Sequence, residues 1–238
     1  MIISIAADPE QAARRAATVI AQRLRLAVRA RGVGLVAVSG GRSPQRLFEL
    51  LAAAPVPWPA VHVFQVDERL APTDSPDRNA TLLRTALLDR IALPPANLHL
   101  MPVELTEPRA GAAAYAATLR RFAGTPPVLD VVHLGLGGDG HTASLVPGDP
   151  VLEEARTEVA VTGAYQGRRR MTLTYPLLAR ARRLVWLVCG ADKADALARL
   201  RRHDATIPAG RVAQHHAVVI ADADAAAPVA AAPSTGVA

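Results

Sequence analysis

Cysteine and aromatic residues are scarce in this sequence, and each shortage excludes a class of protein. Its 238 residues include one cysteine, Cys189, so no disulfide can form within the chain. Such usage is typical of a reducing compartment, and we expect the cytoplasm. Aromatic residues make up 3% of the chain, too few for the stacking platforms that bind single-stranded nucleic acid.

Long apolar runs are missing as well. No uninterrupted apolar stretch approaches the roughly 18 residues that a bilayer requires, so we expect no membrane association. Asp8 and Glu10 lie early in the chain and argue against a secretory signal. The segment 11–31 is rich in arginine, as transit peptides are, but it fits an ordinary amphipathic helix equally well.

The net charge of +6 is the one global feature that favours a nucleic-acid partner. Lys193 is the only lysine, and the arginines are scattered or stand in short groups such as 168–170. Because this distribution is typical of solvated helix faces, we expect no nucleic acid to bind. A basic nucleic-acid binder is kept as an alternative function.

Strand-like and helix-like segments alternate along almost the whole chain. The residues from Asp8 to Gly32 predict a helix over 9–31, with an aspartate cap, a proline in the first turn and a glycine stop. Apolar runs predict strands at "MIISIAA", "VGLVAVSGG", "VHVFQV", "NLHLMPV", "VLDVVHLG", "RMTLTYP", "RLVWLVCG" and "HAVVIAD". Further helices are expected at 43–52, from Asn79 to about Arg90, and in "PRAGAAAYAATLRRF", "LLARA" and "ADKADALARLRR". This alternation predicts a three-layer α/β fold, Rossmann-like, with a mostly parallel open sheet covered by helices on both faces.

No linker divides the chain, so residues 1–221 are predicted to form a single α/β domain. The remaining segment, 222–238, is rich in alanine and proline and offers little bulky side chain to bury. We expect it to be a poorly ordered tail.

Three unusual loops follow predicted strands, and ligands of open α/β sheets bind at the carboxyl ends of strands. The first is "SGGRSP". Its residues Ser39, Gly40 and Gly41 can turn backbone N–H groups toward an anion, while a helix begins at Ser43 and Pro44. Arg42 belongs to the same predicted phosphate-binding loop. The glycines could instead only permit a tight turn, and "AVSGG" also resembles a nucleophile elbow around Ser39.

The second loop is predicted at "DER", followed by the polar segment "LAPTDSPDR". Asp67 beside Arg69 would stay charged and could orient a sugar hydroxyl or a histidine. A plain surface ion pair is the simpler interpretation.

The third loop, "GLGGDGH", combines glycines with Asp139 and His141. An imidazole titrates near pH 6.5 in water, so His141 could accept a proton at neutral pH while Asp139 fixes its tautomer. An incidental loop histidine is the alternative. The other histidines show no metal-ligand spacing, and we expect neither a metal nor a cofactor.

Two late basic residues complete the candidate set. Arg170 begins a predicted strand and Lys193 a predicted helix, and a guanidinium fork with a point-charge ammonium suits a phosphomonoester. Taken singly, each also fits a surface charge.

The ordered set of motifs resembles the 6-phosphogluconolactonase family over about 33–221. The matching stretches are "SGGRSP", "VDERLAPTDSPDRNA", "LDVVHLGLGGDGHTASLVPG", "RMTLTYPLL", "GADKADAL" and "PAGRV". The resemblance implies hydrolysis of 6-phospho-D-glucono-1,5-lactone in the pentose phosphate pathway, and a fold shared with glucosamine-6-phosphate deaminases. It also implies that His141 is the general base, that Arg69 lies in the site, and that the glycine-rich loop and late basic residues bind phosphate.

One departure and two rivals accompany this resemblance. Arg78 stands before Asn79 where "SN" is expected, which leaves the role of position 78 open. Deaminases of this fold resemble "DEY" and "GHIAFNEP" where this chain has "DER" and "GHTASLVP", so the lactonase is favoured. A non-catalytic sugar-phosphate sensor is the other alternative, and we expect a monomer or a weak homodimer.

Overall fold

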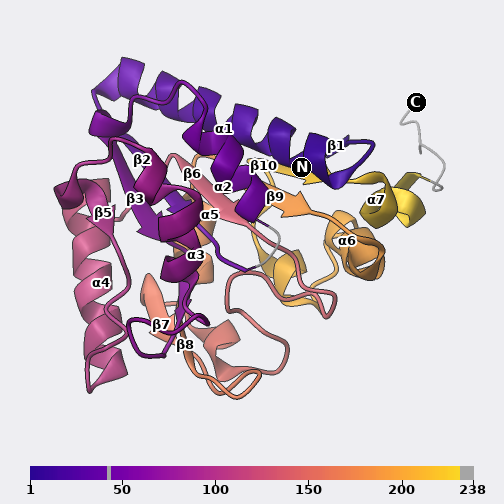
Figure 1. The fold of residues 1–238 in the computed structure, drawn as a ribbon. Helices are drawn as coiled ribbons and strands as arrows, with labels where there is room; N and C mark the ends of the chain where they lie inside the picture. The colour runs from indigo at the N-terminus through magenta and orange to yellow at the C-terminus, as the bar shows by residue number, and fades with distance from the viewer. Residues whose placement is uncertain (42–43, 231–238) are drawn as a thin grey trace.

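A parallel sheet forms the centre of the molecule. The computed structural model describes residues 1–41 and 44–230, and within them a seven-stranded sheet has the order β1-β10-β9-β6-β2-β3-β5 (Figure 1). Every neighbouring pair in it is parallel. The strands are β1 (Ile2–Ile5), β2 (Gly34–Val38), β3 (Val61–Gln65), β5 (Leu98–His99), β6 (Val131–Leu134), β9 (Leu184–Val188) and β10 (Ala217–Ala221). The predicted parallel sheet is confirmed.

Helices cover both faces of this sheet. Leu35 and Ala37 of β2 pack in one apolar cluster, whereas Val36 and Val38 pack in the other, because successive side chains of a strand point to opposite faces. The cluster with Val36 and Val38 includes buried residues of α1 (Pro9–Arg31), α2 (Gln45–Ala52) and α3 (Asn79–Ala86). The cluster with Leu35 and Ala37 includes buried residues of α4 (Pro108–Ala123), α5 (Tyr175–Arg180), α6 (Ala194–Arg201) and α7 (Ala223–Ala230). The three-layer α/β prediction is confirmed.

Helix α1 has the predicted ends. The Asp8 side chain accepts a hydrogen bond from the backbone N–H of Gln11 at 2.7 Å, and Gly32 ends the helix at φ +76° with its N–H on Val28 O. Both ends depend on local residues only, which explains why the sequence specified them. Short 3₁₀ helices occupy Trp58–Ala60, Leu88–Arg90, Pro95–Asn97, Pro150–Glu153, Ala191–Lys193 and Pro208–Arg211.

A second, antiparallel sheet was not predicted. It has the order β4-β8-β7, with β4 (Asp67–Arg69), β7 (Val159–Val161) and β8 (Arg170–Leu173). The expectation that "DER" lies in a loop was therefore wrong. Three charged residues carry no strand signal of their own, and they become a strand only because β8 pairs with them.

Other elements are shorter than predicted. The helix expected to continue to Arg90 ends at Ala86 and passes into a 3₁₀ turn, and the strand expected through Val103 stops at His99. Just beyond the strand, the side-chain Oε1 of Gln65 accepts the Met101 N–H at 2.7 Å. A side-chain acceptor thus takes the place of the backbone acceptor that a continuing strand would use.

The chain end corrects the expectation of a loose tail from position 222. Helix α7 packs against α6, and Ala225 and Ala226 are buried. The buried Asp222 carboxylate accepts the N–H groups of Ala225 and Gly190, which caps the helix and ties it to β9. Alanine side chains are small enough for this close approach. The predicted tail residues 231–238 lie outside the described residues.

A stack of rings covers the β3 and β5 edge of the central sheet. The rings of His62 and His99 lie 5.2 Å apart and nearly parallel, with a ring nitrogen contact of 2.9 Å, and Phe64 and Phe122 lie against His99. Burial, followed by the nearby charges of His62 and Arg121, lowers the pKa of His99 to about 4.

This shift predicts a loss of stability in acid. An unfolded chain protonates His99 near pH 6.5 but the folded one only near 4, so the free energy of unfolding falls as the pH drops through that window. A His99→Phe variant should make the fall shallower, by up to about 1.4 kcal/mol per pH unit. Urea denaturation between pH 7 and 4 measures how the free energy of unfolding changes with pH. His215→Phe, a substitution at an exposed position, is the control. Equal slopes for His99→Phe and wild type would contradict the assignment.

Candidate active site

A cavity of about 170 Å³ opens at the carboxyl ends of the central strands. The chain runs from β2 toward one sheet edge and then returns to place β6 on the other side of β2, so the strand order reverses between them. This switch point is where open α/β sheets bind ligands. Eight of the ten predicted site residues line the cavity: Ser39, Gly40, Gly41, Asp67, Arg69, His141, Arg170 and Lys193. Asp139 lies directly behind His141, and Arg42 lies outside the described residues.

The loop after β6 folds back on itself and brings His141 to the cavity. The Gly137 N–H donates to His141 O at 2.8 Å. A Cβ at position 137 would lie 2.1 Å from Nδ1 of His141. At position 137 the close neighbour is the imidazole itself.

Asp139 holds this imidazole in one orientation. Its Oδ1 lies 2.6 Å from Nδ1 of His141 and also accepts the His141 backbone N–H at 3.1 Å. Partial burial acts to raise the pKa of Asp139, but the backbone N–H, the charge and the ring of His141, together with the Tyr165 hydroxyl, lower it overall. With Asp139 ionised, Nδ1 carries the ring proton, and Nε2 keeps a lone pair.

Tyr165 is a site residue that the sequence reasoning missed. Its hydroxyl donates to Oδ2 of Asp139 at 3.0 Å, and its ring lies 5.5 Å from that of His141. The available signal was the Gln166-Gly167 pair, a turn that places Tyr165 in the hairpin leading to Arg170.

Asp67 is buried. It does not form the ion pair with Arg69 that the sequence suggested. Its two carboxylate oxygens accept hydrogen bonds from Ser39 Oγ at 3.1 Å and Ser144 Oγ at 2.7 Å. Ser144 was also missed. The Ser39 hydroxyl is thus bonded to Asp67 while His141 is bonded to Asp139, so the pair that a serine nucleophile requires is not formed.

Two guanidinium groups face each other at the cavity. Arg69 of β4 and Arg170 of β8 are direct partners in the antiparallel register, which puts both side chains on one face. Among the described residues, the buried Nε atoms of both have no hydrogen-bond partner, and Nη2 of Arg170 makes only a long contact of 3.4 Å to Gln166. Burial lowers the pKa of Arg170, although the Asp67 carboxylate opposes this. Like charges held together in this way favour an anionic ligand.

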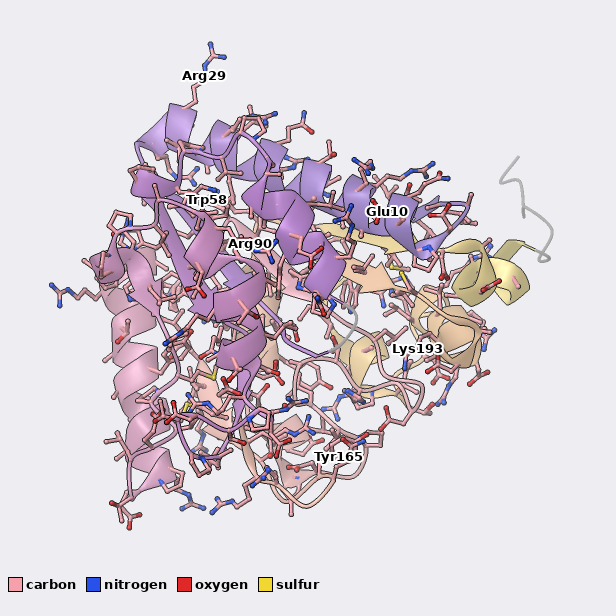
Figure 2. All side chains as sticks on the ribbon, in the orientation of Figure 1. Glu10, Arg29, Trp58, Arg90, Tyr165 and Lys193 are labelled. Carbon is pink, nitrogen blue, oxygen red and sulfur yellow. The ribbon has the colours of Figure 1, made fainter. Side chains whose placement is uncertain are left out.

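The remaining wall combines the glycine turn with residues after β6 and β9. Gly40 packs so closely on Asn79 that a Cβ would lie 2.2 Å from that side chain. Lys193 lies in the turn before α6 (Figure 2). Its side chain lines the cavity, and its Nζ lies 2.7 Å from Asp192. His133 also lines the cavity, and complete burial lowers its pKa to about 4, so it stays neutral. Burial raises the pKa of Cys189 to about 11, which leaves a thiol rather than a thiolate.

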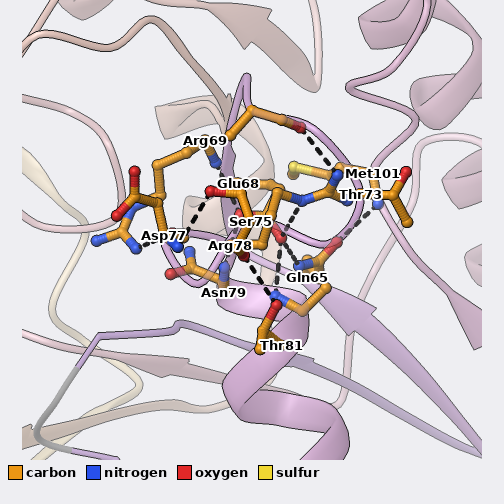
Figure 3. A network of polar contacts seen from close by, with 12 residues as sticks. Gln65, Glu68, Arg69, Thr73, Ser75, Asp77, Arg78, Asn79, Thr81 and Met101 are labelled. Atoms are coloured by element: carbon orange, nitrogen blue, oxygen red, sulfur yellow. Dashed lines mark hydrogen bonds and ion pairs between the residues drawn. The ribbon is translucent and has the colours of Figure 1, made fainter.

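A network around Glu68 fixes the strand that carries Arg69 (Figure 3). The fully buried Glu68 carboxylate accepts the backbone N–H groups of Asn79 and Ala80 at the start of α3, the N–H of Arg69, and the Gln65 amide. Helix α3 and strand β4 are thereby held by one side chain.

Arg78 supplies the positive charge that balances the Glu68 carboxylate. This gives a role to position 78, which the sequence had left open. Its Nε lies 3.3 Å from Glu68, close but not aligned for a hydrogen bond, and Nη1 bonds Glu104 at 2.6 Å and Ala71 O at 3.2 Å. The guanidinium is itself almost completely buried. Arg78 is therefore a structural partner beneath Arg69 rather than a cavity residue.

Replacing Arg78 by methionine should lower the free energy of unfolding by about 3 kcal/mol, because it leaves a buried carboxylate without its cation. Urea denaturation at pH 7 measures the change. Arg84→Met, at an exposed position of α3, is the matched control and should change stability little. A loss no larger than the control's would mean that the hydrogen bonds to Glu68 suffice alone.

Residues 1–41 and 44–230 contain neither a metal-binding cluster nor a membrane-spanning helix. In that part of the chain no three His, Cys, Asp or Glu side chains gather closely enough to hold a metal ion. No helix there is both long and apolar enough to cross a membrane.

Comparison with known proteins identifies relatives that match most of the chain. The family model described as glucosamine-6-phosphate isomerases/6-phosphogluconolactonase matches residues 7–221. A 6-phosphogluconolactonase of Synechocystis sp. is 43% identical over 187 residues, 77% of this chain and 78% of that protein. The solved 6-phosphogluconolactonase of Trypanosoma brucei superposes with a TM-score of 0.84 at 25% identity, covering 96% of this chain and 98% of that one. A monomeric glucosamine-6-phosphate deaminase gives a TM-score of 0.82 at 17% identity, covering 95% and 99%, which shows a shared fold.

Proposed function

Because the chain belongs to the glucosamine-6-phosphate isomerase/6-phosphogluconolactonase family, we propose that it hydrolyses 6-phospho-D-glucono-1,5-lactone to 6-phospho-D-gluconate, a reaction of the oxidative pentose phosphate pathway. One observation carries the proposal. The imidazole of His141, oriented by Asp139 at 2.6 Å, lines the same cavity as the opposed guanidinium groups of Arg69 and Arg170.

The chemistry follows from this arrangement. Nε2 of His141 takes a proton from water, and the water oxygen attacks C1 of the lactone. Arg69 or backbone N–H groups stabilise the negative oxygen that develops at C1. The bond from C1 to the ring oxygen then breaks, and that oxygen leaves as a hydroxyl with the proton that His141 returns. Asp139 stabilises the imidazolium between the two transfers.

The phosphate serves as a handle that keeps C1 near the base. Arg170, Lys193, Arg42 and the turn at 39–41 are its proposed partners, since they combine a guanidinium fork, an ammonium and backbone N–H groups. Asp67 completes the set by holding Ser39 on one side and balancing Arg170 on the other.

The proposal extends to partners and location. The substrate is a small phosphosugar lactone, and neither nucleic acid nor a membrane takes part. We propose a monomer or weak homodimer in the cytoplasm, with a single α/β domain that extends past the predicted boundary at 221 to include α7. The family match covers residues 7–221 of it.

A His141→Ala variant that folds should lose roughly 10²–10⁴-fold in kcat, because this is the usual contribution of a general base. Initial rates at saturating lactone measure it, and circular dichroism confirms folding. His215→Ala, which removes an exposed imidazole, should keep the wild-type rate. Wild-type turnover by His141→Ala would reject the assignment.

An Arg170→Ala variant should raise KM at least about tenfold, because one charged hydrogen bond to the phosphate contributes roughly 1.5–3 kcal/mol. The neighbouring exposed Arg169→Ala is the matched control and should leave KM unchanged. An unchanged KM in both variants would remove Arg170 from the substrate site.

The activity itself is tested by proton release from freshly prepared lactone, corrected for spontaneous hydrolysis. Acceleration by the wild type is expected. Ammonia release from glucosamine 6-phosphate would indicate a deaminase instead. Binding of 6-phosphogluconate without any turnover would indicate a sensor, and affinity for nucleic acid that falls steeply with salt would indicate a nucleic-acid binder.

A further inference from the structure

Tyr165 lies in a tight hairpin that joins β7 to β8. Its backbone exchanges hydrogen bonds of 2.9 and 3.2 Å with that of Arg168, and the two residues between them, Gln166 and Gly167, have φ values of +52° and +77°. Positive φ at both central positions matches the twist of a two-residue hairpin. The Arg168 guanidinium bonds Asp77 at 2.6 and 2.9 Å, which fastens the hairpin to the segment before α3.

From this hairpin Tyr165 contacts three site residues at once. The hydroxyl donates to Oδ2 of Asp139, the carboxylate oxygen that His141 does not use. The ring meets the His141 ring at 61°, and Cζ of Arg170 lies 4.9 Å from the centre of the same ring. Tyr165 therefore links the base and its orienting carboxylate to a cation of the proposed phosphate site.

We propose that Tyr165 is a positioning residue with two separable effects: its hydroxyl sets the basicity of the His141–Asp139 pair, and its ring fixes Arg170 for the substrate anion. This inference rests on the proposed lactonase function and adds to it a residue that touches neither the reacting carbon nor the attacking water.

The effect of the hydroxyl follows from how a carboxylate shares its charge. Asp139 accepts from Tyr165 and His141 together, so part of its negative charge is compensated by the phenol. Burial and the Asp139 carboxylate raise the pKa of Tyr165, which keeps the phenol protonated and donating. Without that donor, Asp139 would stabilise the imidazolium more strongly. Among the described residues, the other charged or titratable groups at this cavity are Asp67, Arg69, His133, Arg170, Cys189 and Lys193. The substitutions below leave all of them in place.

The effect of the ring follows from the unpaired state of Arg170. Within residues 1–41 and 44–230 its guanidinium has few polar partners, with Nε unbonded and Nη2 at 3.4 Å from Gln166. An aromatic face attracts such a cation without neutralising its charge, so the ring restricts Arg170 while leaving its N–H groups for an anion.

The experiment compares Tyr165→Phe with Tyr165→Leu. Tyr165→Phe removes only the hydroxyl, so the acidic limb of the kcat/KM profile should move to higher pH. Its kcat should fall about tenfold, which corresponds to the loss of one hydrogen bond, and its KM should stay unchanged. Tyr165→Leu also removes the ring, so KM should rise as well. Calorimetry should show that Tyr165→Leu binds 6-phosphogluconate several-fold more weakly than Tyr165→Phe does.

Tyr175 provides a matched control. Its hydroxyl donates to Pro208 O at 2.9 Å and Arg211 lies 5.1 Å from its ring, so it makes the same two kinds of contact away from the cavity. Tyr175→Phe should leave the pH profile and KM unchanged.

The outcomes separate this inference from the proposed function. An active wild type whose Tyr165→Phe variant keeps the wild-type pH profile and kcat overturns the role of the hydroxyl. Equal affinity of Tyr165→Phe and Tyr165→Leu for 6-phosphogluconate overturns the role of the ring. A wild type without lactone turnover overturns the proposed function instead, and the binding comparison still tests the ring.

Discussion

The repulsion between two guanidinium groups is the constraint around which this cavity is arranged. The β4 and β8 register places Arg69 directly opposite Arg170, and cross-strand like charges destabilise a sheet. The fold balances them with buried anions on both sides. Asp67 faces Arg170 from within the cavity, and Glu68 points the other way to hold α3 and the backbone of Arg69. Two opposed cations of this kind would be stabilised by an anionic ligand.

The elements that the sequence predicted well are those whose signals are local. Continuous apolar runs marked the parallel strands, and Asp8 with Gly32 marked both ends of α1. Strands β4 and β7 were missed because each has only three residues and forms through partners distant in the sequence. Helix α7 was missed because its stability comes from packing on α6 rather than from bulky side chains.

The same distinction holds in the candidate site. His141 and Asp139 could be predicted because they share one short loop, and eight of the ten candidates line the cavity. Tyr165, Ser144 and Glu68 could not, since each acts through a contact spanning between 11 and 77 residues of sequence. The fold alone decides little, because the deaminase with a TM-score of 0.82 shares it. The choice of reaction depends on side chains.

Helix α7 gives the carboxyl-terminal region an unexpected connection to the cavity. The Asp222 carboxylate that starts this helix also receives the N–H of Gly190, three residues before Lys193, and α7 packs on the turn that contains this lysine. Helix α7 is thus linked through the Asp222 side chain to the turn that carries the Lys193 ammonium. Unwinding α7 would therefore shift the turn that holds Lys193, although none of the described side chains of α7 lines the cavity.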